Sequence, residues 1–354
     1  MVRAKIIGAG GYGGVGIIEI ILRHPEMEIA CLVGVSDVGK NISEVWPHLR
    51  GFCDEVVVAA DSPEAGPDAG ADIAFFATPD GVGQAVAARE LESGRRVVDY
   101  SGDFRFDNVD TYAEYARRIG RTDPHASPDL LAECAYGLTE LNRSEIAAAR
   151  VVGNPGCFAV GCILGLVPAV REGLIDLHGP IVCDAKTGVS GAGKKPGATF
   201  HYPERYENVS AYRLAGHQHV MEIETQLSAA AGEPVKVTFT PQVVPVTRGI
   251  LSTLYAPLAA GVTQKRVEEV YRAAYDGEPF VRLRSLAEPG GTSEVRGSNL
   301  CDVAIACDER TGTFRAVAHL DNLMKGQAGS AMQNANVMFG LDETCGLNLP
   351  GSHP

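Results

Sequence analysis

The segment from Val151 to Phe158 places a cysteine where its thiol is activated. A β-branched run ends in Gly153, the chain turns through Asn154-Pro155-Gly156, and Cys157 follows. The apolar stretch from Phe158 to Val170 predicts a buried helix. At the start of a helix, unpaired backbone N–H groups and the positive end of the helix dipole favour thiolate over thiol. We therefore expect Cys157 to be a nucleophile, whereas the cysteines in other apolar runs are expected to be inert core residues.

A second group of reactive side chains is His217-Gln218-His219, followed by Glu222. If a helix begins here, His219 and Glu222 share one face at a spacing of three residues. Two histidines and one carboxylate are a commonplace match, and the spacing offers no further obvious ligand nearby, so we predict no metal site. The group is predicted to supply the acid/base for the thiol, with His217 as first choice and His219 as second. Glu222 would orient a histidine or contact the substrate.

Two cationic side chains are candidates for binding an anionic substrate. Lys194 ends the glycine-rich loop from Thr187 to Lys195, which has the composition of an anion-binding loop. Arg105 follows the predicted strand Arg96–Tyr100, and a guanidinium in a crevice suits a phosphate or carboxylate. We expect Arg105 and Lys194 to divide the phosphate and the carboxylate of the substrate between them, in an order that the sequence leaves open.

The first ~150 residues have the pattern of a doubly wound α/β sheet. A strand (4–7) is followed by a glycine cluster, a helix (15–23) and a second strand (27–35), and further strands follow at 56–58, 71–77 and 96–100. Glycines between a first strand and a helix allow the backbone to approach a pyrophosphate. The predicted dinucleotide contacts in this part are Gly8, Gly10, Gly11, Tyr12, Gly13, Gly14, Thr78, Pro79 and Ser101.

The end of the second strand bears on the choice of cofactor, because an NAD site places an acidic residue there. Ser36 and Lys40 offer a hydroxyl and a cation for the 2′-phosphate of NADP, while Asp37 would oppose it. The sequence favours NADP without excluding NAD.

The middle of the chain predicts a second, more antiparallel domain. Strands are expected at 180–186, 235–240 and 249–255, and a hairpin at 302–307 and 314–319. The last predicted helix, 328–339, is expected to pack on the first domain. We expect a Rossmann-type domain, 1–153 completed by 322–354, and a catalytic and oligomerisation domain of α+β type, 154–321. Further predicted contacts are Asn154 for the substrate, and Ser190, Gly191, Asn322, Gln333 and Asn336 for the cofactor.

Composition excludes several classes of partner. The formal charge of −13 and the pI near 5.2 argue against nucleic acid or an anionic membrane surface. The longest apolar run, 157–170, is shorter than the ~20 residues that a membrane span needs. Nine cysteines form an odd number without zinc-type spacing, and no secretory segment precedes the first strand. We expect a cytoplasmic enzyme that acts on a small molecule.

Nine motifs in order resemble those of the N-acetyl-γ-glutamyl-phosphate reductases, relatives of aspartate-semialdehyde dehydrogenase. They begin at Gly8, Asp99, Tyr136, Asn154, Ser190, Gly216, Thr247, Gly297 and Asp321. The sequence departs from the family pattern in a few places, including Gly10, where the family usually has Ser or Thr, and Lys194, where it usually has Arg. Both the nucleophile and the candidate base are retained.

The resemblance implies NADPH-dependent reduction of an acyl phosphate to a semialdehyde through a thioester on Cys157, in arginine biosynthesis. It also implies a homo-oligomer, either a dimer or a tetramer. Three alternatives stay open: an aminoadipyl-phosphate reductase of lysine biosynthesis, aspartate-semialdehyde dehydrogenase, and a catalytically silent dinucleotide sensor.

Overall fold

The computed structural model describes residues 1–352, apart from the side chain of Asp68. It divides into two compact units, which are described separately. Unit 1 comprises Met1–Gly156 and Gln327–Asn348, and unit 2 comprises Cys157–Gly326 and the residues after Asn348. The predicted functional domains, 1–153 with 322–354 and 154–321, stay a prediction.

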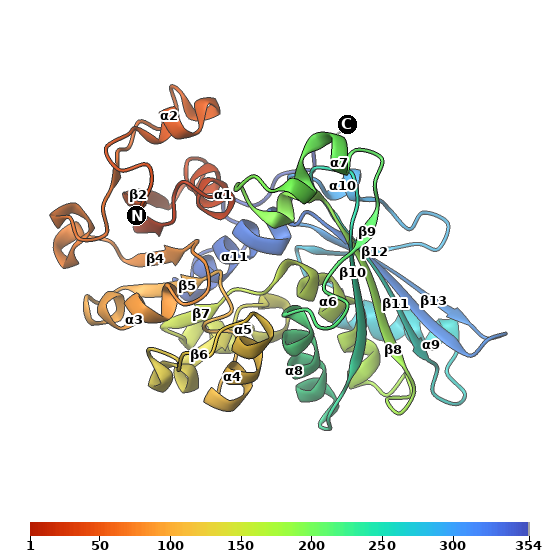
Figure 1. The fold of residues 1–354 in the computed structure, drawn as a ribbon. Helices are drawn as coiled ribbons and strands as arrows, with labels where there is room; N and C mark the ends of the chain where they lie inside the picture. Colours follow the sequence, from red (N-terminus) through yellow and green to blue (C-terminus); the bar gives the residue numbers. More distant parts are fainter. Residues whose placement is uncertain (353–354) are drawn as a thin grey trace. The chain divides into compact units, whose positions relative to one another are not determined.

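Unit 1 is built on a seven-stranded sheet in the order β3-β2-β1-β4-β5-β7-β6, and all of its strand pairs are parallel. Its long apolar strands lie in the middle of the sheet, as expected where helices cover both faces (Figure 1). The predicted Rossmann-type architecture is confirmed. The strands are β1 (Val2–Ile7), β2 (Met27–Val33), β3 (Val57–Val58), β4 (Ile73–Phe76), β5 (Arg96–Asp99), β6 (Cys134–Tyr136) and β7 (Val151–Gly153).

The main helices of this unit are α1 (Tyr12–Ile21), α3 (Gly83–Glu92), α4 (Val109–Arg118), α5 (Thr139–Ala148) and α11 (Gly329–Met338), with a short α2 (Ile42–Val45). Helix α1 begins three residues before the predicted start at Val15, because Gly13 and Gly14 are helical and buried. Strand β2 ends two residues before the predicted Val35, whose side chain is 97% exposed and has no sheet to pack against.

Unit 2 contains a second seven-stranded sheet, in the order β12-β13-β14-β11-β8-β10-β9. Four of its six strand pairs are antiparallel, whereas β8 with β10 and β12 with β13 are parallel. The mostly antiparallel sheet and the hairpin of β13 and β14 are confirmed. The strands are β8 (Ile181–Thr187), β9 (Ser210–Ala211), β10 (Val237–Val243), β11 (Ile250–Pro257), β12 (Val281–Arg284), β13 (Cys301–Asp308) and β14 (Thr313–Leu320).

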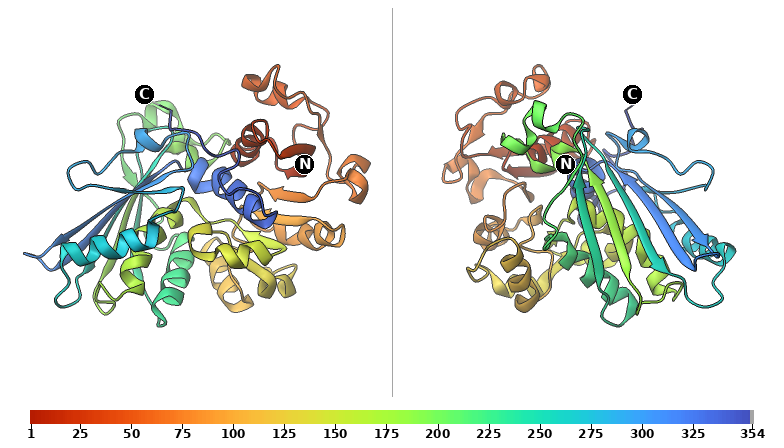
Figure 2. Two further views of the ribbon diagram at one scale, coloured as in Figure 1. Left: turned by 180° about the vertical axis from the view of Figure 1, so that it is seen from behind. Right: turned by 45° about the vertical axis from the view of Figure 1, so that its right-hand side comes forward.

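Helix α6 (Cys157–Arg171) fills the core of unit 2, since every residue from Phe158 to Val170 is buried. It packs on β11 and β14 beside α8 (His219–Ala231) and α9 (Gln264–Tyr275) (Figure 2). Short helices α7 (Tyr202–Arg205) and α10 (Thr292–Val295) lie in connections. The sheet and these helices hold the N-terminus of α6, and therefore Cys157, in a fixed place.

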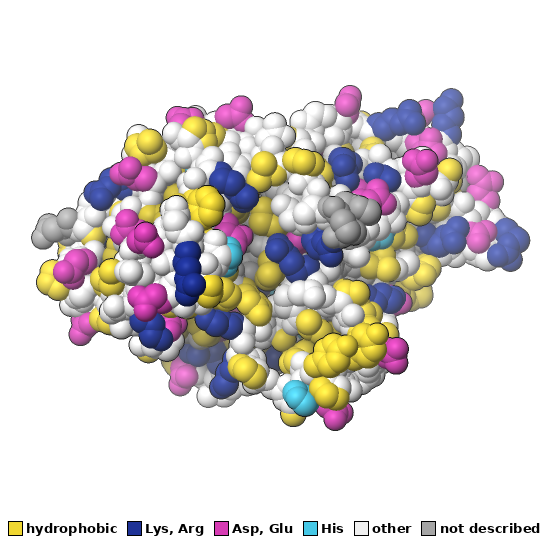
Figure 3. All heavy atoms as spheres, turned by 90° about the horizontal axis from the view of Figure 1, so that it is seen from above, with side chains coloured by type: hydrophobic (Ala, Val, Ile, Leu, Met, Phe, Trp, Pro, Cys, Tyr) yellow, Lys and Arg dark blue, Asp and Glu magenta, His cyan; other side chains and the backbone are white. Residues whose placement is uncertain are grey.

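In the described part of the chain, no helix is both long and apolar enough to cross a membrane. The face shown in Figure 3 carries acidic and basic side chains interspersed with hydrophobic ones. Large hydrophobic side chains that are exposed include the stacked pair Tyr202 and Tyr206, whose rings lie 5.2 Å apart.

Candidate active site

Cys157 is the first residue of α6 and is partly exposed. The turn at Pro155-Gly156 ends the parallel strand β7 and aims the chain into the helix. No acidic residue lies in the first turn of α6, so nothing there opposes a negative charge on sulfur. This is the strand–turn–helix setting predicted from the sequence.

Gly326 lies against Cys157 and was not predicted as part of the site. A Cβ atom on Gly326 would lie 2.8 Å from Cys157 Cβ, closer than real carbon atoms approach each other. Gly326 belongs to a π-helical turn, Met324–Ala328, at the start of α11. Such turns are rare and occur often at functional sites. The glycine therefore lets this turn pass directly beside the thiol-bearing residue.

The Asp321 carboxylate holds the chain that leads into this turn. It is fully buried, accepts hydrogen bonds from the Arg248 guanidinium at 3.0 and 3.2 Å, and accepts N–H bonds from Gly297, Leu323 and Met324. The Asp321 carboxylate thus joins three of the sequence motifs, at 247–249, 297–299 and 321–326.

His217 is buried and its ring is neutral. Its Nδ1 accepts the backbone N–H of His219 at 3.2 Å, which places the ring proton on Nε2. Burial, with smaller effects of the neighbouring His219 and Arg213, lowers the pKa of His217 to about 2, against an opposing effect of Glu222. In this conformation His217 can donate a hydrogen bond from Nε2, but it is poorly prepared to accept a proton.

His219 begins α8, and its Nε2 lies 4.0 Å from the buried carboxylate of Glu222. The predicted shared face of these two side chains is confirmed. A carboxylate at this distance stabilises a protonated imidazole. His219, the second choice from the sequence, is thus the better candidate for the acid/base, and the role of either histidine stays a prediction.

An aromatic cage surrounds the two histidines. The Phe158 ring packs edge-on against His217 at 5.7 Å and His219 at 6.0 Å, and Tyr212 packs against His217 at 5.7 Å. Burial raises the pKa of Tyr212, and the charge of Cys157 raises it further, so this phenol lies in the field of the thiolate. Nothing in the sequence spacing identified Tyr212.

The loop after β8 brings together three residues predicted to contact the cofactor. Asn322 Nδ2 donates to Ser190 Oγ at 2.9 Å, Asn322 Oδ1 accepts the N–H of Gly249 at 2.8 Å, and Gly191 lies beside them. The Asn322 side chain is thus occupied in joining two segments of unit 2. Lys194, at the end of the same loop, is exposed. The binding roles of Ser190, Gly191 and Lys194 stay predictions.

The glycine cluster of unit 1 forms a cradle at the start of α1. Gly8 has φ +93°, and a Cβ there would lie 2.3 Å from the carbonyl oxygen of Ala77. The N-cap residue Gly11 provides no side-chain cap, and the first turn holds no acidic residue, so the helix start is open to an anion. Tyr12 begins the helix, with its ring 5.9 Å from that of Trp46.

Polar atoms at the ends of β4 and β5 support a ligand in this cradle. Thr78 Oγ1 and Tyr100 Oη are buried and have no hydrogen-bond partner among the described residues. Thr78 precedes Pro79 and lies next to Gly8, while the Tyr100 ring lies next to Gly13. Buried polar groups without partners are expensive, and a bound dinucleotide would supply partners. The residues of unit 1 therefore fit a nicotinamide dinucleotide.

Two predicted binding residues support the scaffold instead. Ser101 Oγ donates to Asp99 at 2.5 Å and accepts the N–H of Asp103. The side-chain amide of Asn154 donates to Gln327 O and accepts from Asn334 Nδ2. The backbone carbonyl of Asn154 accepts from Arg105 Nε at 2.7 Å. Their side chains stabilise the strand ends, so we omit Ser101 and Asn154 from the proposed contacts.

Arg105 is buried and also donates from Nη2 to the carbonyl of Tyr100 at 2.6 Å. It therefore joins the ends of β5 and β7 and fixes the turn before Cys157. Asn336 is likewise fully buried, bonded to the His24 ring and to the carbonyls of Glu343 and Cys345, and it too is omitted as a cofactor contact. Gln333 Nε2 donates to Glu140 and Glu343.

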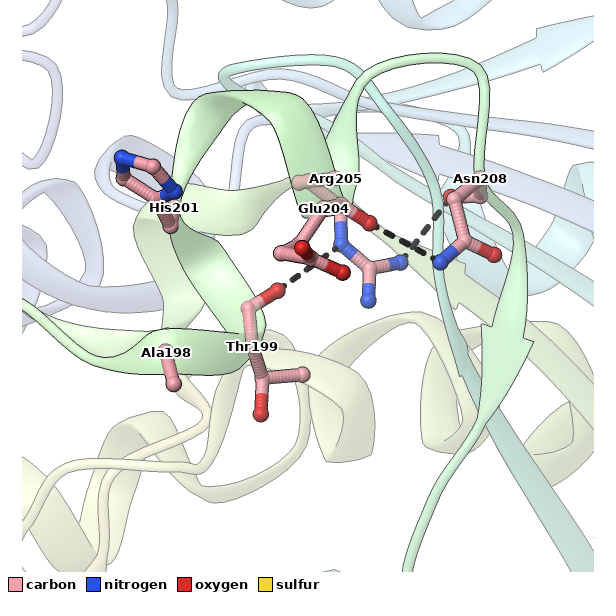
Figure 4. A pocket seen from close by; sticks show the side chains of 6 residues that line it. All are labelled: Ala198, Thr199, His201, Glu204, Arg205 and Asn208. Atoms are coloured by element: carbon pink, nitrogen blue, oxygen red, sulfur yellow. Dashed lines mark hydrogen bonds between the residues drawn. The ribbon is translucent and has the colours of Figure 1, made fainter.

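One surface cavity of about 640 Å³ lies in the connection that contains α7 (Figure 4). Arg205 is its most buried polar residue, and it donates to the carbonyls of Thr199, Asn208 and Val243. These bonds hold the connection together, and the cavity contains none of the predicted catalytic residues.

Comparison with known proteins decides the family. Models of the "Semialdehyde dehydrogenase, NAD binding domain" and the "Semialdehyde dehydrogenase, dimerisation domain" match residues 3–149 and 157–322. An N-acetyl-gamma-glutamyl-phosphate reductase from Symbiobacterium thermophilum is 44% identical over 98% of this chain and 97% of its own. One from Bacillus cereus (strain AH187) is 41% identical over 98% of both chains. The chain belongs to the N-acetyl-gamma-glutamyl-phosphate reductase family.

This reductase family shares its fold with aspartate semialdehyde dehydrogenases. The Vibrio cholerae aspartate semialdehyde dehydrogenase II complexed with ASA has a TM-score of 0.71 at 18% identity, covering 96% of this chain and 98% of that one. The enzyme from Candida albicans, solved with NADP, has a TM-score of 0.68 at 18% identity, covering 96% and 99%. The family resemblance carried by the nine motifs is confirmed.

Proposed function

We propose that this chain reduces N-acetyl-γ-glutamyl phosphate to N-acetylglutamate semialdehyde and phosphate, in arginine biosynthesis, with NADPH as reductant. Cys157 carries the proposal, because it starts α6 beside Gly326 and the next residue, Phe158, packs against both histidines. A helix start favours the thiolate. The curated relatives that bear the reductase name support the choice of substrate.

The thiolate of Cys157 attacks the γ-carbonyl carbon, and the C–O bond to phosphate breaks, with the electron pair leaving on phosphate. The product is a thioester on Cys157. When bound, NADPH supplies the hydride that reduces this thioester to a thiohemiacetal. The C–S bond then breaks to give the semialdehyde, and the thiolate is restored.

Proton transfer is assigned to the histidine pair. His219, beside Glu222, takes the thiol proton and gives it to the thiohemiacetal oxygen as the hydride adds. It takes this proton back from the hydroxyl when the C–S bond breaks. His217 donates a hydrogen bond from Nε2, which suits a sulfur anion or a developing oxyanion. Lys194 is proposed to bind the substrate phosphate or carboxylate, and Arg105 to position the turn before Cys157.

We propose that Gly8, Gly10, Gly11, Gly13 and Gly14 approach the pyrophosphate, and that Tyr12, Thr78 and Pro79 line the same site. Ser36 and Lys40 are the proposed contacts for the 2′-phosphate, which would have to displace the Asp37 carboxylate that both side chains contact. A cytoplasmic location fits the nine cysteines, none of which forms a disulfide. A dimer or tetramer is proposed from the dimerisation-domain match.

The test is the phosphate-dependent reverse reaction, in which N-acetylglutamate semialdehyde and NADP⁺ yield the acyl phosphate. Cys157→Ser should lower kcat by about 10³-fold or more, because a serine hydroxyl at this site has no comparable activation. Dinucleotide affinity should be unchanged, since the cradle lies in unit 1. Robust turnover by the serine variant would overturn the thioester mechanism, and failure of the wild type with this substrate would overturn the proposed function.

A further inference from the structure

The carboxylate of Asp37 lies over the glycine cradle. A Cβ atom on Gly10 would be only 2.8 Å from Asp37 Oδ2. Asp37 follows the second strand of the sheet, where an acidic residue accepts hydrogen bonds from the adenosine ribose of NAD. The carboxylate is thus placed where the 2′-position of a dinucleotide would lie.

The two donors suited to a 2′-phosphate are turned toward the same carboxylate. Lys40 Nζ lies 3.1 Å from Asp37 Oδ1, and Ser36 Oγ donates to Oδ2 at 3.3 Å. The Asp37 side chain is 19% exposed and that of Lys40 is 53% exposed. One anionic group therefore already engages both the hydroxyl and the cation.

We propose that Asp37 takes the place of the 2′-phosphate and sets the dinucleotide preference of this chain. A dinucleotide with a free 2′-hydroxyl then finds a complete site, with Asp37 as acceptor and Lys40 balancing its charge. A 2′-phosphate has to displace the carboxylate from Lys40 and Ser36 and is repelled by it. The chain consequently binds NAD(H) with an affinity within about tenfold of that for NADP(H).

Gly10 leaves the space that the Asp37 carboxylate occupies at the cradle. A methyl group at this position would meet the far end of the flexible Asp37 side chain, which can rotate away, rather than rigid backbone. Gly10→Ala therefore moves the carboxylate off the cradle without removing any charge. It should change the preference in the same direction as Asp37→Asn.

The experiment measures binding without turnover. Trp46 is the only tryptophan in the sequence, and its ring lies 5.9 Å from that of Tyr12 at the cradle, so its fluorescence reports on ligands there. Wild type, Asp37→Asn, Gly10→Ala and Lys40→Met are titrated with NAD⁺, NADP⁺, 5′-AMP and 2′,5′-ADP. Asp61→Asn is the matched control, because it removes the same charge from an exposed residue after β3.

Wild type should bind the two dinucleotides within about tenfold of each other. Asp37→Asn and Gly10→Ala should each shift the ratio toward NADP⁺ by about tenfold, and 2′,5′-ADP should follow NADP⁺. Lys40→Met should weaken NADP⁺ and 2′,5′-ADP more than their unphosphorylated counterparts. The Asp61 control should leave the ratio unchanged.

Two results would overturn the role of Asp37: a wild type that prefers NADP⁺ by more than about 100-fold, or ratios within twofold of wild type in both Asp37→Asn and Gly10→Ala. The inference rests on the proposed function only for the presence of a dinucleotide site. Absence of all dinucleotide binding would overturn both proposals. The expected ratios without reductase activity would overturn the proposed function alone.

Discussion

At the scale of single residues, the distribution of one proton between two histidines decides how the thiol is activated. Nδ1 of His217 is occupied by a backbone N–H, and burial holds the pKa of this ring near 2. His219 instead faces the carboxylate of Glu222. The protonated imidazole that stabilises a thiolate is therefore expected at His219.

Iodoacetamide alkylation of Cys157 tests this assignment. The wild-type rate should rise with an apparent pKa below the free-thiol value of about 8.5. His219→Gln should raise that apparent pKa by about one unit, and Glu222→Gln should produce a smaller shift in the same direction. His217→Gln should change it less, because a neutral ring contributes only a hydrogen bond. A larger effect of His217→Gln would reverse the two roles.

The sequence pointed to the candidate reactive residues more directly than to the residues packed around them. Cys157, His217, His219 and the glycine cradle follow from local rules, because a helix start and a βαβ turn are short-range patterns. Tyr212 and Gly326 join the site through tertiary packing, which spacing cannot reveal. Arg213, next to Tyr212, has φ +46°, a conformation that its residue type does not predict.

At the scale of elements, the π-helical turn beside α6 fixes the position of the thiol. Gly326→Ala would place a methyl group 2.8 Å from Cys157 Cβ and 3.2 Å from its Cα, so the nucleophile has to shift. A misplacement of a reacting group by about 1 Å costs about 100-fold in rate. We expect kcat to fall by that order while far-UV circular dichroism is unchanged. Gly197→Ala is the control, because its added Cβ would meet only Phe200, at 3.7 Å; equal losses in both variants would exclude a specific contact.

Asp99, at the end of β5, makes the stability of unit 1 depend on pH. Burial raises the pKa of this carboxyl to about 8, and the nearby Asp103 contributes, against the lowering effect of the Ser101 hydrogen bond. A carboxyl whose pKa is raised in the folded state binds its proton more tightly there. Its contribution to stability is therefore present below about pH 3.8 and is lost as the pH rises toward 8.

Asparagine has the shape of a protonated aspartic acid and is uncharged at every pH. Asp99→Asn should therefore abolish this loss of stability with rising pH. We expect the gain of the variant over the wild type to be larger at pH 8 than at pH 5 by about 1 kcal/mol or more, because the wild type loses stability over this whole range. Urea unfolding at the two pH values measures the difference. Asp110→Asn, an exposed position in α4, should show no such dependence. A variant that is equally destabilised at both pH values would mean that the ionised form is the native one.

Most elements were predictable, since strands and helices with long apolar runs carry a clear period. The errors lie at ends that tertiary contacts decide, such as the start of α1 among tightly packed glycines and the end of β2. The order of strands in the second sheet was not predictable either. Strands β8 and β10 pair in parallel only because α8 connects them, and no local pattern encodes this.

At the scale of the whole molecule, one face of the sheet in unit 2 suits a second copy of the chain. Helix α6 packs on Ser252, Leu254, Ala316 and Ala318, so the alternate residues of β11 and β14 point to the opposite face. Within the described part of unit 2, that face carries half-exposed Leu251, Thr253 and Val317, with Tyr255 37% exposed. Helices α6, α8 and α9 lie on the other face (Figure 2).

Apolar side chains on an open sheet face are stabilised when another surface covers them. We therefore expect light scattering to give a mass of two or four times 37.4 kDa for the wild type. Val317→Lys places a charge in the centre of this face and should dissociate the oligomer, so that the measured mass falls to half that of the wild type or less. Lys265→Glu in α9, on the opposite face of the sheet, is the control for a change of surface charge. If Val317→Lys stays folded and keeps the wild-type mass, the chains associate through a different surface, because a buried lysine without a partner could not be accommodated there.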